Sequence, residues 1–310
     1  MAKVLFLTNP KQDYLDDSML YGLRRVLNGN CVDLPRKDSM YADYVAEAPL
    51  YGNGFTIWKQ LPNITVDREL IDSRITHGEF DLIVIGSIAR QFHSRRAEIL
   101  GILKAAITSR TKLVFLDGED SPDFRREQIF GMLGRYLKRE SLIRTGLFSR
   151  PIAFSIPTAR VVPSLNTDKK FLFSKHVQCD EAYRISYIRE NCQKSYAFSK
   201  ELDYRRNLAE SFFAVTMKKS GWDCMRHYEI AASGCVMAFY CLEEKPARCA
   251  PFGLVDMHNA ISFSTARELE AKIELIFREN RYPTLQENSY RWAINNTCEN
   301  RARLLLNDLI

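Results

Sequence analysis

Short apolar runs alternate with amphipathic helical patterns through the first half of the chain. Buried strands are predicted at 4–7, 31–34, 81–87 and 112–116, and helices at 16–27 and 95–108. Asp16 or Asp17 is expected to cap the first helix. Repeated strand–helix units favour a parallel sheet covered by helices on both faces. Because ligands of such sheets bind beyond the carboxyl ends of the strands, Asn9, Ser87 and the acidic loop 117–120 are expected along one rim.

The middle of the chain divides this pattern from a second one. Residues 41–56 predict an irregular loop, and residues 151–163, with three prolines, predict a hinge. Strands follow at 170–173, 214–217, 235–240 and 260–263, with helices at 181–191, 204–213, from Ser264 or Thr265 onward, and 285–310. We therefore expect an N-terminal Rossmann-like domain over 1–150, the hinge, a C-terminal Rossmann-like domain over 164–295, and a last helix, 296–310, that packs back on the first domain.

Composition narrows the class of protein. The chain has 310 residues, enough for two domains, and no apolar run reaches the ~20 residues of a membrane span. Its start does not have the pattern of a signal peptide. The eight cysteines form no CxxC pair and no zinc spacing, so we expect a reduced, cytoplasmic protein without a metal site.

Positive charge is concentrated in one region. Residues 86–150 hold 13 Lys/Arg against 7 Asp/Glu, which equals the net charge of +6 of the whole chain. Two interpretations remain open. The stretch contacts a phosphate-rich partner such as double-stranded DNA, or it consists of solvated helix faces. The residues singled out for an acceptor or nucleic acid are Arg90, Arg95, Arg96, Arg125 and Arg126.

The most informative segment is 218–236. A polar loop, Lys219-Ser220-Gly221, leads into a helical pattern that carries Arg226 and Glu229, and an Ala-Ser-Gly turn then leads into an apolar strand. Free amide groups at a helix start favour a bound phosphate. An arginine can hold a diphosphate bidentately, and a carboxylate can accept ribose hydroxyls. The alternative is an ordinary i,i+3 ion pair. His227 is either a sugar contact or a surface histidine, and Trp222 either stacks on a base or packs between the domains.

The segment 221–229 (GWDCMRHYE) resembles the nucleotide-sugar signature of GT-B glycosyltransferases, and more narrowly the GWD-x-x-R-x-YE segment of the bacterial and phage CgeB-like group. Residues 138–140 (KRE) and 152–157 (IAFSIP) are similar to a second segment of that group. The resemblance implies an α/β fold of two Rossmann-like domains with parallel sheets facing a cleft. It also implies a nucleotide sugar, with UDP as the expected nucleotide, held through Glu229 on the ribose and Arg226 on the diphosphate. Many retaining members have an acid where this chain has Gly221.

The expected activity is transfer of a hexose or pentose to an acceptor hydroxyl, with the donor as co-substrate and no separate cofactor. Asp117, Asp17 and His93 are candidate bases for the acceptor proton. Alternatively, Asp117 belongs to a turn whose acids cap the next helix or pair with Arg125 and Arg126. Asp17 is alternatively a helix cap, and His93 a solvated histidine. The acceptor is either a glycan or a hydroxymethylated base in phage DNA. The competing hypothesis is a GT-B-shaped binding protein without catalysis. A monomer or weak dimer is expected.

Overall fold

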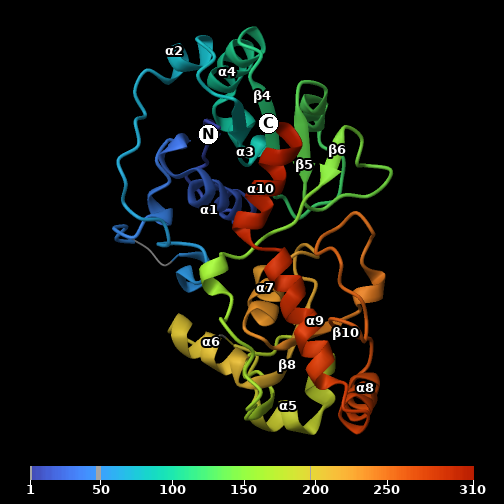
Figure 1. Cartoon of the computed structure of the whole chain (residues 1–310). Coiled ribbons are helices and arrows are strands. Elements are labelled where there is room, and N and C mark those ends of the chain that lie inside the picture. Colours follow the sequence, from blue (N-terminus) through green and yellow to red (C-terminus); the bar gives the residue numbers. More distant parts are fainter. Residues whose placement is uncertain (1, 47–49, 196) are drawn as a thin grey trace. The chain divides into compact units, whose positions relative to one another are not determined.

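The computed structural model describes residues 2–46, 50–195 and 197–310, which form two compact units (Figure 1). The first contains the chain up to Pro157 together with Arg248–Ala250 and Cys298–Ile310, and the second contains Thr158–Ala247 and Pro251–Thr297. The chain thus passes between units at Pro157, within the segment predicted as a hinge. The short return of Arg248–Ala250 to the first unit has no counterpart in the sequence pattern. Part of the irregular loop predicted at 41–56, residues 47–49, lies outside the described residues.

The first unit is built on a six-stranded parallel sheet with the order β2-β1-β3-β4-β5-β6. Its strands are β1 (Val4–Leu7), β2 (Cys31–Leu34), β3 (Leu82–Ile85), β4 (Lys112–Asp117), β5 (Arg135–Lys138) and β6 (Ser149–Pro151). The first four match the predicted apolar runs. The sequence pattern did not reveal β5 and β6, because β5 begins and ends with a charged residue and β6 is only three residues long.

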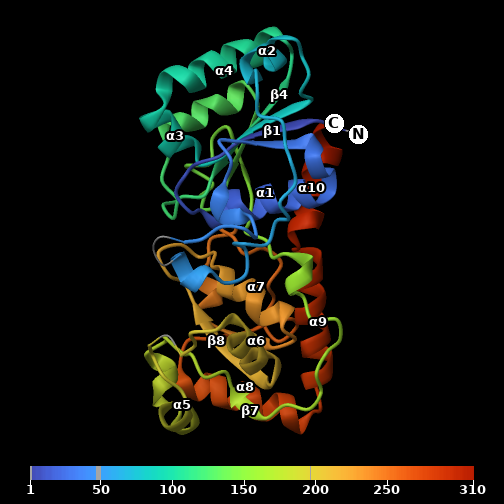
Figure 2. The ribbon, with the colours of Figure 1, turned by 90° about the vertical axis from the view of Figure 1, so that its left-hand side faces the viewer.

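Helices cover both faces of this sheet, as Figure 2 shows. On one face lie α2 (Ile71–Thr76), α3 (Ile88–Ser94) and α4 (Arg96–Thr108), whose apolar side chains form one core cluster with β1, β3 and β4. On the other face, α1 (Tyr14–Leu27) packs along α10 (Cys298–Leu309). The two helices approach closely at Gly22, where an added Cβ would lie 2.1 Å from the Cys298 carbonyl oxygen.

One predicted helix cap is wrong. Asp13, rather than Asp16 or Asp17, caps α1, and its carboxylate accepts hydrogen bonds from the backbone N–H groups of Leu15 and Asp16. Asp16 and Asp17 lie in the first helical turn and are buried. The pattern Asp-x-x-Asp-Asp offers several acceptors, and the helix begins where the first of them can reach free backbone amides.

The second unit contains a four-stranded parallel sheet with the order β10-β9-β8-β7. Its strands are β7 (Phe171–Phe173), β8 (Ser211–Met217), β9 (Val236–Tyr240) and β10 (Ile261–Phe263). Its helices are α5 (Ser186–Asn191), α6 (Glu201–Ala209), α7 (Met225–Ala232), α8 (Ala266–Arg278) and α9 (Tyr282–Asn295). Thr265 caps α8 as predicted, with its side chain accepting from the Glu268 N–H.

Three predicted helices of the second half differ from the structure. The segment 181–191 is a short 3-10 turn and α5, separated by the extended residue Ile185. The helix predicted at 204–213 ends at Ala209, because Phe213 pairs in β8 beside Phe173 of β7. The single helix predicted over 285–310 is α9 and α10, interrupted at 296–297. In each case tertiary packing overrides a helical pattern.

Two findings apply to the described residues. No helix among them is long and apolar enough to cross a membrane. No group of three or more His, Cys, Asp or Glu side chains within 2–46, 50–195 and 197–310 is arranged to hold a metal ion.

Candidate functional site

The predicted donor segment lies at the carboxyl edge of the second sheet. β8 ends at Met217, the loop 218–224 follows, and α7 begins at Met225. The loop after β7, from Ser174 onward, lies at the same edge, because β7 and β8 are parallel neighbours. This is the edge at which parallel α/β sheets bind ligands. The sequence prediction of a loop, a helix with Arg226 and Glu229, a turn and a strand is therefore confirmed as local structure.

Arg226 is fixed by contacts to both neighbouring strand ends. Its Nη2 donates to the His176 carbonyl at 2.6 Å and to the Ser174 hydroxyl at 3.2 Å, and its Nε reaches the Val215 carbonyl at 3.5 Å. The side chain is half-buried. A guanidinium held by neutral carbonyl and hydroxyl oxygens keeps its full positive charge for an anionic ligand.

Glu229 and Arg226 meet at one hydroxyl. The Tyr204 hydroxyl, from α6, donates to Glu229 Oε2 at 2.8 Å and accepts from Arg226 Nη1 at 3.0 Å. Burial and the neighbouring Glu229 carboxylate raise the pKa of Tyr204, so the phenol stays protonated and acts as the donor. Glu229 is 8% exposed. The pair predicted as either ligand contacts or an i,i+3 ion pair is thus organised around a third residue.

Further positive charge lies beside Arg226. Lys219 Nζ donates to Gln178 Oε1 at 2.5 Å, and partial burial together with Arg226 lowers the pKa of Lys219. Burial, Arg226 and Lys219 lower the pKa of His176 to about 4, so its ring is neutral near pH 7. Lys219 and Ser220 are exposed, whereas Gly221 is buried.

A small pocket joins these groups. Its lining comes from the loop after β7, the end of β8 and the start of α7: His176, Gln178, Cys179, Val215, Thr216, Met217, Lys219 and Arg226. Its volume is about 10 Å³, room for roughly one water molecule. Arg226 and Lys219 are the two cations of its lining, and groups of this kind bind phosphate oxygens.

His227 and Trp222 face the interior of the second unit. His227 is fully buried, with Nδ1 3.0 Å from the Thr216 hydroxyl and Nε2 3.0 Å from the Trp222 carbonyl oxygen. It is therefore not the surface histidine that was the alternative, and a contact with a sugar would require these bonds to open. Trp222 stacks on Phe239 with ring centroids 6.4 Å apart, so its ring packs within the second unit.

The carboxyl edge of the first sheet gathers three carboxylates at the start of α1. Asp17 is buried and accepts from Trp58 Nε1 at 2.8 Å, with Lys37 Nζ 3.3 Å away. Asp16 accepts from the Ser87 backbone N–H at 3.0 Å and from its hydroxyl at 2.5 Å. Burial, followed by the charge of Asp13, raises the pKa of Asp16 well above its usual range.

Asp13 is slightly less buried than Asp17, with 6% of its side chain exposed against 1%. It is half-buried as a residue, Arg90 Nη1 lies 3.3 Å from its Oδ2, and the Ser87 hydroxyl donates to the same oxygen at 3.3 Å. Burial of the carboxylate and the charge of Asp17 raise its pKa, although Arg90 opposes this. A carboxylate with a raised pKa at a ligand-binding edge has the properties of a proton acceptor.

The other predicted bases occupy different surroundings. Asp117 is buried, accepting from the Tyr136 hydroxyl at 2.8 Å and forming an ion pair with Lys138 at 3.0 Å. The alternative, that acids of the loop 117–120 pair with Arg125 and Arg126, holds for Arg125, which lies 3.5 Å from Glu119, whereas Arg126 pairs with Glu127. His93 is exposed on α3.

Four of the five arginines predicted for an acceptor or nucleic acid have acidic partners. Arg90 contacts Glu119 at 2.8 Å as well as Asp13, and Arg125 contacts Glu119 at 3.5 Å. The other two pairs are Arg95 with Glu98 and Arg126 with Glu127, while Arg96 lies over the Phe92 ring. Arg90 and Arg125 thus share Glu119, and Arg95 and Arg126 each have a separate acidic partner.

Sequence reasoning missed Tyr204, His176 and Asp13. Tyr204 lies 22 residues before Arg226, on another helix, so no local motif connects them. His176 follows a three-residue strand. Of the three, only Asp13 could have been found from the sequence, because it lies three residues before an acidic pair and directly before the predicted helix.

The fold has counterparts among solved structures, although the sequence matches no protein-family model and no curated protein. Anabaena HepE in complex with UDP and glucose aligns over 100% of this chain and 99% of its own, with a TM-score of 0.55 and 12% identity. A glycosyltransferase from Rickettsia africae aligns over 99% and 97%, with a TM-score of 0.56 and 9% identity. Sucrose-phosphate synthase from Thermosynechococcus elongatus aligns over 100% and 98%, with a TM-score of 0.50 and 10% identity. The chain thus has the α/β GT-B fold, with two parallel sheets.

Proposed function

We propose that the protein is a glycosyltransferase that uses a nucleotide sugar and binds it in the second unit. The observation that carries the proposal is the convergence of Arg226, Tyr204 and Glu229 at the carboxyl edge of a parallel sheet. The shared fold supports it, since HepE is described in complexes with UDP and with UDP-glucose. UDP is accordingly our proposed nucleotide.

The donor contacts follow from the chemistry of each group. Glu229 accepts hydrogen bonds from the ribose hydroxyls, with Tyr204 holding one of its oxygens in place. Arg226 and Lys219 neutralise the diphosphate, and the exposed Ser220 completes the rim. Because these cations offset the charge that develops on the leaving diphosphate, the residues themselves can stabilise departure of the nucleotide.

Transfer makes one bond and breaks one. The acceptor oxygen forms a bond to the anomeric carbon, the bond from that carbon to the β-phosphate oxygen breaks, and the acceptor proton passes to a base. Among the carboxylates of the first unit we propose Asp13 for this role, because Asp17 and Asp117 are buried against Lys37 and Lys138.

A saccharide hydroxyl is the acceptor class that we propose. Free positive charge in 86–150 would favour DNA, yet most of the arginines singled out there are paired with acids. Pairing lowers the charge available to phosphates. Hydroxymethylated duplex that fails to bind at low salt would agree with this choice, and salt-sensitive binding would reverse it.

Hydrolysis of a panel of sugar nucleotides tests the activity. We expect slow release of nucleoside diphosphate from one UDP sugar, abolished in Arg226→Ala and unchanged in Arg267→Ala, which removes an exposed arginine from α8. Binding of UDP without turnover of any donor, with or without saccharide acceptors, would establish the inactive binding protein instead. Absence of both binding and turnover would overturn the proposal.

A further inference from the structure

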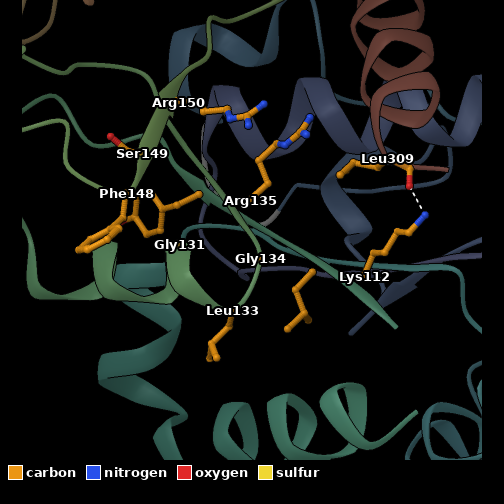
Figure 3. Close-up of a pocket in the computed structure, with 11 residues that line it drawn as sticks. Lys112, Gly131, Leu133, Gly134, Arg135, Phe148, Ser149, Arg150 and Leu309 are labelled. Atoms are coloured by element: carbon orange, nitrogen blue, oxygen red, sulfur yellow. Dashed lines mark hydrogen bonds between the residues drawn. The ribbon is translucent and has the colours of Figure 1, made fainter. Parts of the chain in front are cut away.

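A cavity of about 530 Å³ lies at the amino edge of the first sheet, opposite to the edge that holds Asp13. Figure 3 shows its lining. Residues at the starts of β4, β5 and β6 contribute most of it, together with the end of α10: Lys112, Leu113, Gly131, Leu133, Gly134, Arg135, Tyr136, Phe148, Ser149, Arg150 and Leu309. Cavities of this size hold small ligands or parts of larger ones.

The cavity wall is positively charged. Figure 3 shows the Arg135 and Arg150 side chains extending next to each other toward α10, with Lys112 across the cavity, where its ammonium donates to the Leu309 carbonyl. Asp308 forms an ion pair with Arg135. Burial, together with repulsion from Arg150, lowers the pKa of Arg135. Three cations therefore face one carboxylate, an arrangement that an added anion would stabilise.

Exposed apolar side chains are frequent in the segments next to this cavity, and two of them, Leu133 and Phe148, are part of its lining. Seven of the eighteen exposed large hydrophobic residues in the described part of the chain fall within 124–148: Phe124, Ile129, Met132, Leu133, Ile143, Leu147 and Phe148. The two segments that carry most of them are tied together, since Gln128 Nε2 donates to the Thr145 carbonyl at 2.9 Å and to the Leu147 carbonyl at 3.0 Å. Met132 and Leu147 are 68% and 58% exposed, respectively. We call this surface the apolar rim.

We propose that the cavity and the apolar rim together dock on an anionic phospholipid surface, with a lipid phosphate between Arg135, Arg150 and Lys112. A soluble phosphate compound would need the cations but not apolar side chains outside the cavity. An apolar protein partner would need the rim but not the excess of positive charge. Basic groups beside exposed apolar side chains match the boundary between lipid headgroups and acyl chains.

Vesicle co-sedimentation with the full chain tests this inference. We expect binding to phosphatidylcholine vesicles that contain about one third phosphatidylglycerol, and not to phosphatidylcholine alone, because each basic residue near an anionic surface contributes roughly five-fold in affinity. Arg150→Gln should weaken binding by about that factor, and Leu147→Ser should weaken it as well. Arg267→Gln and Val255→Ser remove an exposed cation and an exposed apolar side chain elsewhere and should have no effect.

The other occupants give distinguishable results. Calorimetric binding of inorganic pyrophosphate that depends on Arg150 and not on Leu147, without vesicle binding, would show a soluble phosphate ligand and overturn the proposal. So would dimerisation lost in Leu147→Ser, or duplex DNA binding lost in Arg150→Gln, when vesicles are not bound. Equal binding to both vesicle types would show that an anionic surface is not required and would overturn the proposal. The donor assays do not involve this cavity, so either proposal can fail alone.

Discussion

Glu229→Gln is the substitution whose effect on nucleotide binding can be derived most fully from the structure. Tyr204 donates to one carboxylate oxygen at 2.8 Å, and a glutamine oxygen can accept the same bond. The free energy of unfolding should therefore fall by only about 1–1.5 kcal/mol. Hydrogen bonds to a charged acceptor stabilise by about 1.5–3 kcal/mol and those to a neutral one by about 0.5–1.5 kcal/mol.

If Glu229 accepts hydrogen bonds from two ribose hydroxyls, Glu229→Gln should lose about 2–3 kcal/mol of binding free energy, which corresponds to a roughly 30- to 150-fold weaker affinity for UDP. Calorimetry with UDP and 2′-deoxy-UDP, on the wild type and on Glu229→Gln, isolates the contact in a thermodynamic cycle. The wild type should prefer UDP, and the variant should lose about 5- to 10-fold of that preference. Glu274→Gln, on the exposed side of α8, is the matched control and should bind both nucleotides like the wild type. If the variant weakens both ligands equally, Glu229 does not contact the 2′-hydroxyl and the reasoning fails.

Three further predictions concern catalysis, packing and pH. Asp13→Asn should abolish transfer to an acceptor while UDP affinity, measured by calorimetry, stays within about two-fold; retained transfer would exclude Asp13 as the base. Gly22→Ala should lower the free energy of unfolding by more than about 2 kcal/mol, because its Cβ would overlap the Cys298 carbonyl, whereas Gly101→Ala, in open space on α4, should raise it by about 0.5–1 kcal/mol. Because the pKa of His176 is lowered to about 4 in the folded protein, its contribution to the stability of the fold is complete above the unfolded pKa of about 6.5. This contribution is lost as the pH falls toward 4. Between pH 6.5 and pH 4 the free energy of unfolding, measured with denaturant, should fall by about 2–3 kcal/mol more in the wild type than in His176→Gln. Parallel pH dependences of the two proteins would contradict the lowered pKa of His176.

The sequence predicted those parts of the fold in which apolar runs are uninterrupted. β1, β3, β9 and residues 113–116 of β4 are contiguous apolar segments, so burial on both faces of a parallel sheet can be inferred from them. β5 includes Arg135 and Lys138, and Lys138 is buried only because Asp117 of the neighbouring strand pairs with it. A strand that depends on such a partner carries no local apolar signal. The break at Ile185 and the early end of α6 depend likewise on contacts far away in the chain.

The candidate site was predictable only where its residues are neighbours in sequence. Arg226 and Glu229 lie one turn apart on a single helix, so their shared face follows from the helical period. Tyr204, which joins them, comes from another helix, and His176 comes from the loop after another strand. The sequence also does not show which polar side chains are buried. His227 is an example, because its two ring nitrogens contact Thr216 and Trp222 inside the second unit.

A crystal structure of the protein with UDP tests the central claim most directly. The account predicts the ribose hydroxyls within hydrogen-bonding distance of the Glu229 carboxylate and the diphosphate against Arg226 and Lys219, at the carboxyl edge of the second sheet. Nucleotide bound at any other place, with the Arg226–Tyr204–Glu229 arrangement unchanged and unoccupied, would contradict it.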